Sequence, residues 1–358
     1  MNRPACHTRA GCRILPPHIL RAIAQNGTPQ QRAAALQTLA TDNTLRNLRA
    51  AQAAAVRGRS RAPQVLAAEV KAQRAVYDTH HSQNLPGDIV RAEGQNPVSD
   101  PAVDEAYDAL GDTFRFYWEV YERNSIDDEG LHLDATVHFG QNYDNAFWNG
   151  QQMVFGDGDG EVFNRFTISL DVIGHELTHG VTQDEAGLMY VFQSGALNES
   201  LSDVFGSLVK QYALKQTAEA ADWLIGDGLF TAKVHGVALR SMKAPGTAYD
   251  DPLLGKDPQP ATMRDYVHTF QDNGGVHINS GIPNHAFYLA ATAIGGYAWE
   301  KAGRIWYETL RDPRLRPSAK FQQFARRTAA NAGRLYGETS AEKQAVVAAW
   351  EQVGIRAT

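Results

Sequence analysis

Five residues near the middle of this 358-residue chain, His175-Glu176-Leu177-Thr178-His179, combine two metal-binding side chains with a carboxylate. The mostly apolar run from Leu170 to Gly174 before them indicates a helix. On a helix, positions i and i+4 lie on one face, so both imidazoles can reach one Zn²⁺ at roughly 2.0–2.1 Å. Glu176 lies beside the first ligand and can face a metal-bound water. The pattern is typical of a zinc hydrolase with a carboxylate general base.

A catalytic zinc needs a third protein ligand, which a second element must supply. Apolar residues at helical spacing predict a helix over residues 197–212. If this helix runs antiparallel to the first, Glu199 can reach the metal. Asp203, one turn further on, can then accept an N–H from a ligand imidazole. Each acidic residue alone would be interpreted as part of a solvated helix face, but their joint spacing favours a metal site.

These residues resemble the thermolysin-like zinc metallopeptidases, in which His-Glu-x-x-His is followed at this distance by Asn-Glu-x-x-Ser-Asp, here residues 198–203. Three further runs match that family: Asn145-Ala146-Phe147-Trp148, Gly156-Asp157-Gly158-Asp159-Gly160 and the Gly-Gly-Val-His-Ile-Asn-Ser-Gly run at 274–281. The resemblance covers about residues 62–358. Zinc aminopeptidases with a similar His-Glu core lack these other runs.

The resemblance implies a role for each matching residue. His175, His179 and Glu199 would hold one zinc ion. Glu176 would take a proton from the zinc-bound water and pass it to the leaving amine. The implied activity is a zinc-dependent neutral endopeptidase that hydrolyses peptide bonds on the amino side of bulky hydrophobic residues.

Further residues are implied to act on the substrate. His277 and Tyr190 would donate hydrogen bonds to the oxyanion of the tetrahedral intermediate, and Asp272 would orient His277. Without the family pattern, His277 would be interpreted as a satisfied core histidine and Tyr190 as a packing residue. The substrate-binding set consists of groups that hold the backbone and of an apolar pocket: Asn145, the Ala146 carbonyl and Arg240, then Phe163, Val172, Ile225 and Leu239.

Calcium is where the chain departs from the family. Larger relatives bind a calcium pair through acidic residues near the zinc helix, and Asp171, Asp222 and Asp227 match those positions. Lys210 stands where a calcium-binding Glu is expected, and its ammonium would replace the charge of one cation. We therefore expect reduced calcium binding, with one ion or none. The Gly156–Gly160 run is interpreted as a turn, in which calcium binding stays an open alternative.

The N-terminal arm differs in charge from the rest of the chain. Residues 1–62 contain ten Arg, no Lys, no Glu and only Asp42, whereas the remaining residues have a net charge of −15. This asymmetry favours docking of the arm onto an acidic body. The alternatives are a solvated basic face and a nucleic-acid-binding arm, but the arm lacks a recognisable nucleic-acid-reading module, so we expect no nucleic-acid partner.

The arm also resembles the short propeptide of protealysin-like members of the family, which is marked by a Pro-Pro turn and an apolar pair, here Pro16-Pro17-His18-Ile19-Leu20. The implication is a zymogen whose own propeptide inhibits it and is cut off between about residues 50 and 62. Within the arm, Thr28 and Pro29 predict a helix start, followed by a second helical stretch over 44–56.

Both cysteines of the chain, Cys6 and Cys12, lie in the arm. Cys12 just precedes the Pro-Pro turn, and a thiolate is a good fourth zinc ligand, so it could silence the zymogen. The alternatives are a Cys6–Cys12 bridge and incidental cysteines beside a turn that blocks the cleft sterically. The arm lacks the continuous apolar core of a signal peptide, so we expect cytoplasmic residence or secretion by a non-standard route, with reduced thiols.

The predicted fold class is α+β, a two-lobed zincin with the zinc helix between the lobes. We expect a helical propeptide at 1–58, a β-rich N-terminal catalytic lobe at 59–170 and an α-helical C-terminal lobe at 171–358. A helix is predicted from residue 101 to about 123, and strands at 131–137 and 152–155. The uncharged run at 286–299 is about 14 residues, too short to span a bilayer. Peptide or protein substrates are the expected partners, and the alternative function is a catalytically silent zinc-binding interaction protein on the same scaffold.

Overall fold

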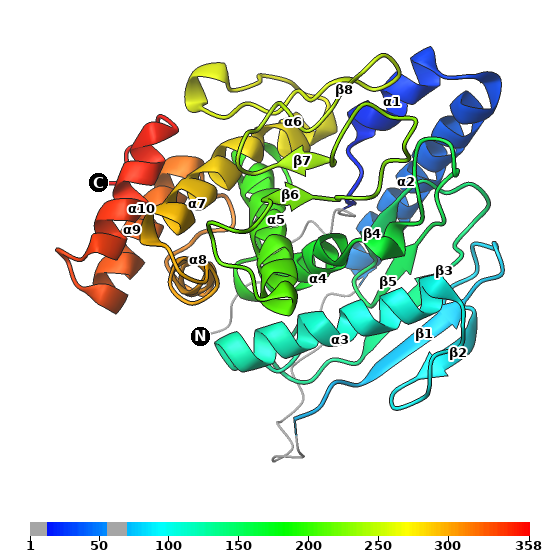
Figure 1. The fold of residues 1–358 in the computed structure, drawn as a ribbon, viewed down its shortest axis with the longest axis horizontal. Coiled ribbons are helices and arrows are strands. Elements are labelled where there is room, and N and C mark those ends of the chain that lie inside the picture. Colours follow the sequence, from blue (N-terminus) through cyan, green and yellow to red (C-terminus); the bar gives the residue numbers. More distant parts are fainter. Residues whose placement is uncertain (1–12, 56–69) are drawn as a thin grey trace.

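The computed structural model describes residues 13–55 and 70–358 (Figure 1). It begins with two helices, α1 (Pro17–Asn26) and α2 (Pro29–Ala55). Thr28 starts α2 as expected, because its hydroxyl accepts the Gln31 N–H while the Gln31 side chain accepts the Thr28 N–H. The sequence predicted two helical stretches in this region, and α2 instead continues to Ala55 without a break.

A five-stranded sheet follows, with the strand order β2-β1-β3-β5-β4. Strands β1 and β3 are parallel, and so are β3 and β5, whereas β2 and β4 pair antiparallel at the two edges. The bounds are β1 (Arg74–Asp78), β2 (Asp88–Ala92), β3 (Leu133–Val137), β4 (Ala146–Trp148) and β5 (Gln152–Phe155). The two strands predicted from alternation are therefore central and parallel, which explains why β5 is buried along its whole length.

Helix α3 (Pro101–Tyr121) packs across this sheet (Figure 1). Asp100 caps it by accepting the Ala102 N–H at 2.9 Å, as its position before Pro101 predicts. Its apolar stripe is buried except for Trp118, which lies at the surface near the end of the helix.

The rest of the chain is mainly helical, as predicted (Figure 1). Its helices are α4 (Leu170–Glu185), α5 (Phe192–Leu214), α6 (Asp272–Asn279), α7 (Gly281–Ile294), α8 (Ala302–Leu310), α9 (Phe321–Tyr336) and α10 (Ala341–Gln352). The short elements between them are η1 (Phe166–Ile168), β6 (Leu224–Ile225), β7 (Arg240–Ser241), β8 (Asp250–Asp251), β9 (Gly255–Lys256) and η2 (Met263–Asp265). The two-lobed α+β fold is thus confirmed, and among the described helices none is long and apolar enough to cross a membrane.

Helices α4 and α5 lie against each other at the centre of the molecule (Figure 1). Glycines on both helices make this approach close. A Cβ on Gly206 would lie 2.3 Å from the carbonyl oxygen of Asp171, and a Cβ on Gly174 would lie 3.1 Å from the Gly206 Cα. Because neither position tolerates a side chain without a shift, the glycine pair sets how near the two helices bring their functional residues.

Candidate metal centre and cleft

The two imidazoles on α4 face each other across one turn of the helix. His175 and His179 are buried, and their Nε2 atoms lie 3.0 Å apart. On the far side, His175 Nδ1 lies 2.8 Å from Asp203 Oδ1, and His179 Nδ1 lies 2.8 Å from Asn198 Oδ1. These oxygen acceptors favour a proton on each Nδ1, so both Nε2 lone pairs point at the same space. Two lone pairs held this close fit a bridging cation.

Glu199 on α5 completes this donor set. Its Oε2 is 3.5 Å from His175 Nε2, and its Oε1 is 3.5 Å from His179 Nε2. The buried Oε2 has no hydrogen-bond partner among the residues that the structure describes. Two neutral imidazoles and one carboxylate are the nitrogen and oxygen ligands that a catalytic zinc prefers, so these residues fit that ion.

Burial and the neighbouring His175 both lower the pKa of His179. Desolvation, reinforced by repulsion from His175, lowers the pKa of His179 well below its ordinary value. His179 therefore stays neutral at physiological pH, which is the state that ligates metal. Ser202, whose Oγ lies 2.9 Å from His179 Nδ1, is a second neighbour of this ring that the sequence interpretation did not assign.

Asp203 connects the metal centre to the cleft. Besides His175, it binds Arg240 in bidentate fashion, with N–O distances of 2.9 and 2.8 Å, and accepts from Asn284 Nδ2 at 2.8 Å. Burial alone would raise the pKa of this carboxyl, but Arg240 and His175 outweigh burial and hold the pKa well below its usual range. The role of Asn284 was missed because it lies 81 residues further along the chain, with no local signal to link it to Asp203.

Glu176 is oriented by the sheet. Its Oε2 accepts the backbone N–H of Trp148 in β4 at 2.9 Å, and the side chain is buried beside the two imidazoles. This bond ties the carboxylate of α4 to the edge strand of the N-terminal lobe. The Trp148 amide is another partner that the sequence did not reveal.

His277, Asp272 and Tyr190 form a hydrogen-bonded group next to Glu199. His277 Nδ1 lies 2.7 Å from Asp272 Oδ1, and its Nε2 lies 3.2 Å from the Tyr190 hydroxyl, which in turn donates to Glu199. Burial disfavours a charged ring, but Asp272 and Glu199 outweigh burial and raise the pKa of His277 to about 9. His277 therefore carries a proton on both nitrogens at neutral pH.

The backbone at the start of α6 makes this pairing possible. Asp272, Asn273, Gly274 and Gly275 all have φ between +52° and +90°, a left-handed run that the two glycines accommodate at low cost. The run turns the Asp272 carboxylate back under the helix, where its second oxygen accepts the His277 N–H at 3.0 Å. The glycines matched in the 274–281 motif thus position the carboxylate.

Residues 13–15 of the arm lie next to β4 and bend at Ile14 and Leu15. The Ile14 N–H donates to the Ala146 carbonyl at 3.3 Å, and the Leu15 N–H donates to Asn145 Oδ1 at 3.1 Å. Arg240 Nη1 donates to the Ile14 carbonyl at 3.0 Å. His277 Nε2 lies 3.0 Å from the carbonyl oxygen of Arg13. The backbone-holding groups that the sequence predicted therefore all contact the arm.

A buried ion pair holds the arm in this position. Arg13 Nε lies 2.7 Å from Asp42 Oδ1 on α2, and Asp42 also accepts from the Tyr143 hydroxyl at 2.6 Å and from Asn145 Nδ2 at 3.1 Å. Composition singled out Asp42 as the one acid of the arm, but gave it no role.

The predicted apolar pocket residues are all buried. Phe163, Val172, Ile225 and Leu239 belong to the same continuous apolar cluster as Ile14, whose side chain is also fully enclosed. Cys12 and Cys6 lie outside the described residues.

Lys210 pairs with two of the predicted calcium ligands, Asp171 of α4 and Asp222. Its Nζ lies 2.7 Å from Asp171 Oδ2 and 3.1 Å from Asp222 Oδ1, and it donates to the Leu224 carbonyl at 3.0 Å. Burial opposes its charge, but Asp171 and Asp222 outweigh burial and raise the pKa of Lys210. Asp227 is exposed and contributes its backbone carbonyl, which accepts from Ser169.

Comparison with known families covers nearly the whole chain. The model described as "Thermolysin metallopeptidase, catalytic domain" matches residues 43–183, and "Thermolysin metallopeptidase, alpha-helical domain" matches 186–355. A third, "Protealysin propeptide", matches residues 12–40.

Individual relatives agree with these matches. An extracellular metalloprotease of Pectobacterium carotovorum subsp. carotovorum is 57% identical over 97% of each chain. A thermolysin of Bacillus caldolyticus is 41% identical over 78% of this chain and 50% of that protein. Among solved structures, the precursor of protealysin from Serratia proteamaculans matches with a TM-score of 0.87 and 57% identity, covering 96% of this chain and 99% of that one.

Proposed function

This chain belongs to the thermolysin-like metallopeptidases and carries a propeptide of the protealysin family, and from that membership we propose a zinc endopeptidase zymogen that cleaves before bulky hydrophobic residues. His175, His179 and Glu199 would hold the zinc ion. Zinc bound there would make water acidic enough to attack at neutral pH and would polarise the substrate carbonyl. The remaining steps fall to the protein's own side chains.

Glu176 is the proposed general base. Its buried carboxylate lies beside the imidazole pair and is held by the Trp148 N–H, which leaves it aimed at the space where the nucleophilic water must stand. It would accept the water proton and then pass that proton to the leaving amine.

His277 is the proposed oxyanion donor. Its proton on Nδ1 is committed to Asp272, so the proton on Nε2 points into the cleft, where the Arg13 carbonyl now lies. The Tyr190 hydroxyl, 3.2 Å from the same Nε2, would supply a second donor when substrate replaces the arm. A preorganised donor of this kind is worth roughly 2.7–4 kcal/mol in the transition state.

The single observation that supports this function best is the way the cleft holds the arm. The Arg13 carbonyl lies on the proposed oxyanion donor, and both the N–H and C=O of Ile14 are bound by Ala146 and Arg240. We infer that Arg13 and Ile14 occupy the positions before and after a scissile bond. Ile14, fully buried in an apolar cluster, then stands for the bulky hydrophobic residue that a substrate would present.

The same contacts support inhibition by the propeptide. A substrate cannot bind while the arm uses the backbone-holding groups, and the Arg13–Asp42 pair keeps the arm in place. The proposed thiolate of Cys12 as a further zinc ligand stays a separate hypothesis, as do the predicted lobe boundaries. The presence of Glu176, Tyr190 and His277 in one cluster favours this enzyme over a silent interaction protein.

Two finer proposals follow the same reasoning. The Lys210 ammonium, paired with Asp171 and Asp222, replaces a cation between these carboxylates, which supports reduced calcium binding. The Pectobacterium relative is named an extracellular protease, which favours secretion over cytoplasmic residence for this chain.

Cleavage of casein by the processed protein tests the proposal. We expect hydrolysis that a zinc chelator abolishes and resupplied zinc restores. Glu176→Gln should retain the zinc and still accept the Trp148 N–H, but lose turnover because an amide cannot take the proton. Full peptidase activity in this variant would show that the proposed base is wrong.

A further inference from the structure

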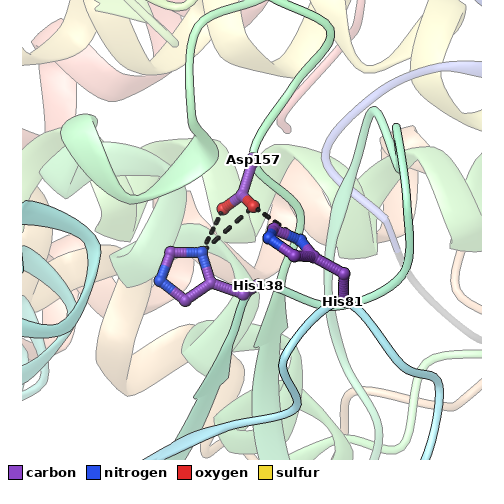
Figure 2. Close-up of side chains that lie close together, drawn as sticks. All are labelled: His81, His138 and Asp157. Atoms are coloured by element: carbon purple, nitrogen blue, oxygen red, sulfur yellow. Dashed lines mark hydrogen bonds and ion pairs between the residues drawn. The ribbon is translucent and has the colours of Figure 1, made fainter.

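We propose that His81, His138 and Asp157 form a second transition-metal site, which shares no ligand with the first (Figure 2). The candidate ligand atoms of the three side chains all lie within 4.8 Å of one another. This site would give a role to Asp157 of the Gly-Asp-Gly-Asp-Gly run. The proposed peptidase mechanism assigns no role to that residue.

The topology brings these residues together. Parallel strands β1, β3 and β5 are neighbours in the sheet and end at Asp78, Val137 and Phe155. His81, His138 and Asp157 each follow one of those ends within three residues. Because the carboxyl ends of parallel strands meet at one edge of a sheet, three loops far apart in sequence converge there.

The atoms that face one another have the separations of metal ligands. His138 Nδ1 lies 2.9 Å from Asp157 Oδ1, and His81 Nδ1 lies 3.3 Å from Asp157 Oδ2 (Figure 2). Tetrahedral bonds of about 2.0 Å require neighbouring ligand atoms to lie about 3.3 Å apart. Small side-chain adjustments would therefore seat an ion among the three groups.

The backbone holds both histidines in place. The His81 N–H donates to the His138 carbonyl at 2.9 Å, and the Thr79 hydroxyl donates to the same carbonyl at 2.7 Å. His81 and His138 have φ values of 60° and 53°, a left-handed conformation that is costly for residues other than glycine.

A fourth residue orients the second imidazole. Asp100, the cap of α3, lies 3.0 Å from His138 Nε2 through its Oδ2. A proton on Nε2 shared with this carboxylate fixes the ring, and a metal bound at Nδ1 would displace the proton that Nδ1 now shares with Asp157. A carboxylate orients His175 in a similar way, but through the other ring nitrogen. Asp203 binds its Nδ1, and its Nε2 faces His179 Nε2, where the first zinc ion is proposed to bind.

The ligand chemistry selects the class of ion. Two imidazoles with one carboxylate suit Zn²⁺ and similar divalent transition metals, whereas Ca²⁺ prefers a shell of oxygens. The side chain of His81 is 54% exposed, so solvent can complete the coordination. An ion here would join three loops of the sheet edge and stabilise the folded state by mass action.

The test counts zinc in the full chain. Wild-type protein, equilibrated with low micromolar Zn²⁺ and then freed of loose metal by gel filtration, should carry two equivalents by elemental analysis. His81→Gln should carry one and keep its fold, because the replaced side chain is largely exposed. His80→Gln is the matched control, since His80 faces Asp78 and Asp88 instead, and it should carry two.

Thermal unfolding gives a second measurement. Zn²⁺ added beyond the first equivalent should raise the Tm of the wild type and of His80→Gln, and leave the Tm of His81→Gln unchanged. A single equivalent in the wild type, or two equivalents in His81→Gln, would overturn the proposal, as would loss of the second ion in His80→Gln. Casein hydrolysis should be equal in all three processed proteins, which separates this site from the proposed zinc of the cleft.

Discussion

Acid should release the arm from the cleft, and His18 on α1 is the residue expected to sense it. His18 Nε2 lies 2.9 Å from the Tyr249 hydroxyl. Its Nδ1 is enclosed and has no hydrogen-bond partner within the described residues. Protonation while the arm is docked would therefore bury an N–H without an acceptor.

The surroundings of His18 set the size of the effect. Burial is the main cause that lowers the pKa of His18 from 6.5 to about 4; Asp272 attracts the imidazolium, whereas His277, Arg240 and Arg21 repel it. The group is neutral in the docked arm and titrates normally once released, so docking is strongest above pH 6.5 and weakens as the pH falls towards 4. At pH 5 this difference amounts to about 2 kcal/mol, or about 30-fold in the docking equilibrium.

Hydrogen exchange of the α1 amides measures this equilibrium in the full chain. Glu176→Gln should prevent self-processing and serves as the parent protein. Adding His18→Gln to this parent keeps an N–H donor for Tyr249 but removes the titratable group. Between pH 8 and pH 5, after correction for intrinsic exchange, we expect α1 to lose about 30-fold more protection in the parent than in the double variant.

Equal losses of protection in the two proteins would refute this reasoning. Protonation of the proposed zinc ligands would also weaken the site in acid, but it would affect both proteins alike, so the comparison isolates His18. A larger loss in the double variant than in its parent would likewise contradict the assigned direction of the pKa shift.

Three further predictions concern His277, Lys210 and calcium. His277→Gln should lower kcat on peptide substrates by about 10²–10³ with little change in KM, because it removes a donor that acts mainly in the transition state; a change confined to KM would assign His277 to substrate binding instead. Lys210→Met should reduce the free energy of unfolding by about 3–5 kcal/mol, because it leaves the buried Asp171 without its charge partner. Wild-type Tm should change little with calcium or with a calcium-selective chelator, and a large fall in Tm on chelation would contradict the proposed role of Lys210.

The sequence could predict those residues whose relative positions follow from their spacing along one helix. His175 and His179 share a face because they lie one helical turn apart, and the capped start of α3 follows from Asp100 and Pro101. The partners that the sequence did not reveal are contributed from a distance, such as the Trp148 amide on Glu176. Their side chains or backbone groups meet only after the lobes have packed, so no periodicity reports them.

The arm shows how tertiary contacts override local preference. The two predicted helical stretches left residues 40–43, Ala-Thr-Asp-Asn, between them, and three of these four residues have low helix propensity. Helix α2 nevertheless continues through them. Asp42 is buried in the middle of this run, where it pairs with Arg13 and accepts from Tyr143. These contacts stabilise the helical conformation that the local sequence disfavours.

Asp203 joins the proposed metal ligand His175 to Arg240, which is proposed to hold the substrate backbone. Its carboxylate orients the His175 ring and at the same time holds both Nε and Nη2 of Arg240, so the guanidinium cannot turn. The remaining nitrogen, Nη1, is thereby directed at the Ile14 carbonyl. A charge placed between the imidazoles would pull on the same carboxylate that fixes the arginine. Substitution of Asp203 is therefore expected to weaken both zinc binding and the binding of a peptide backbone by Arg240.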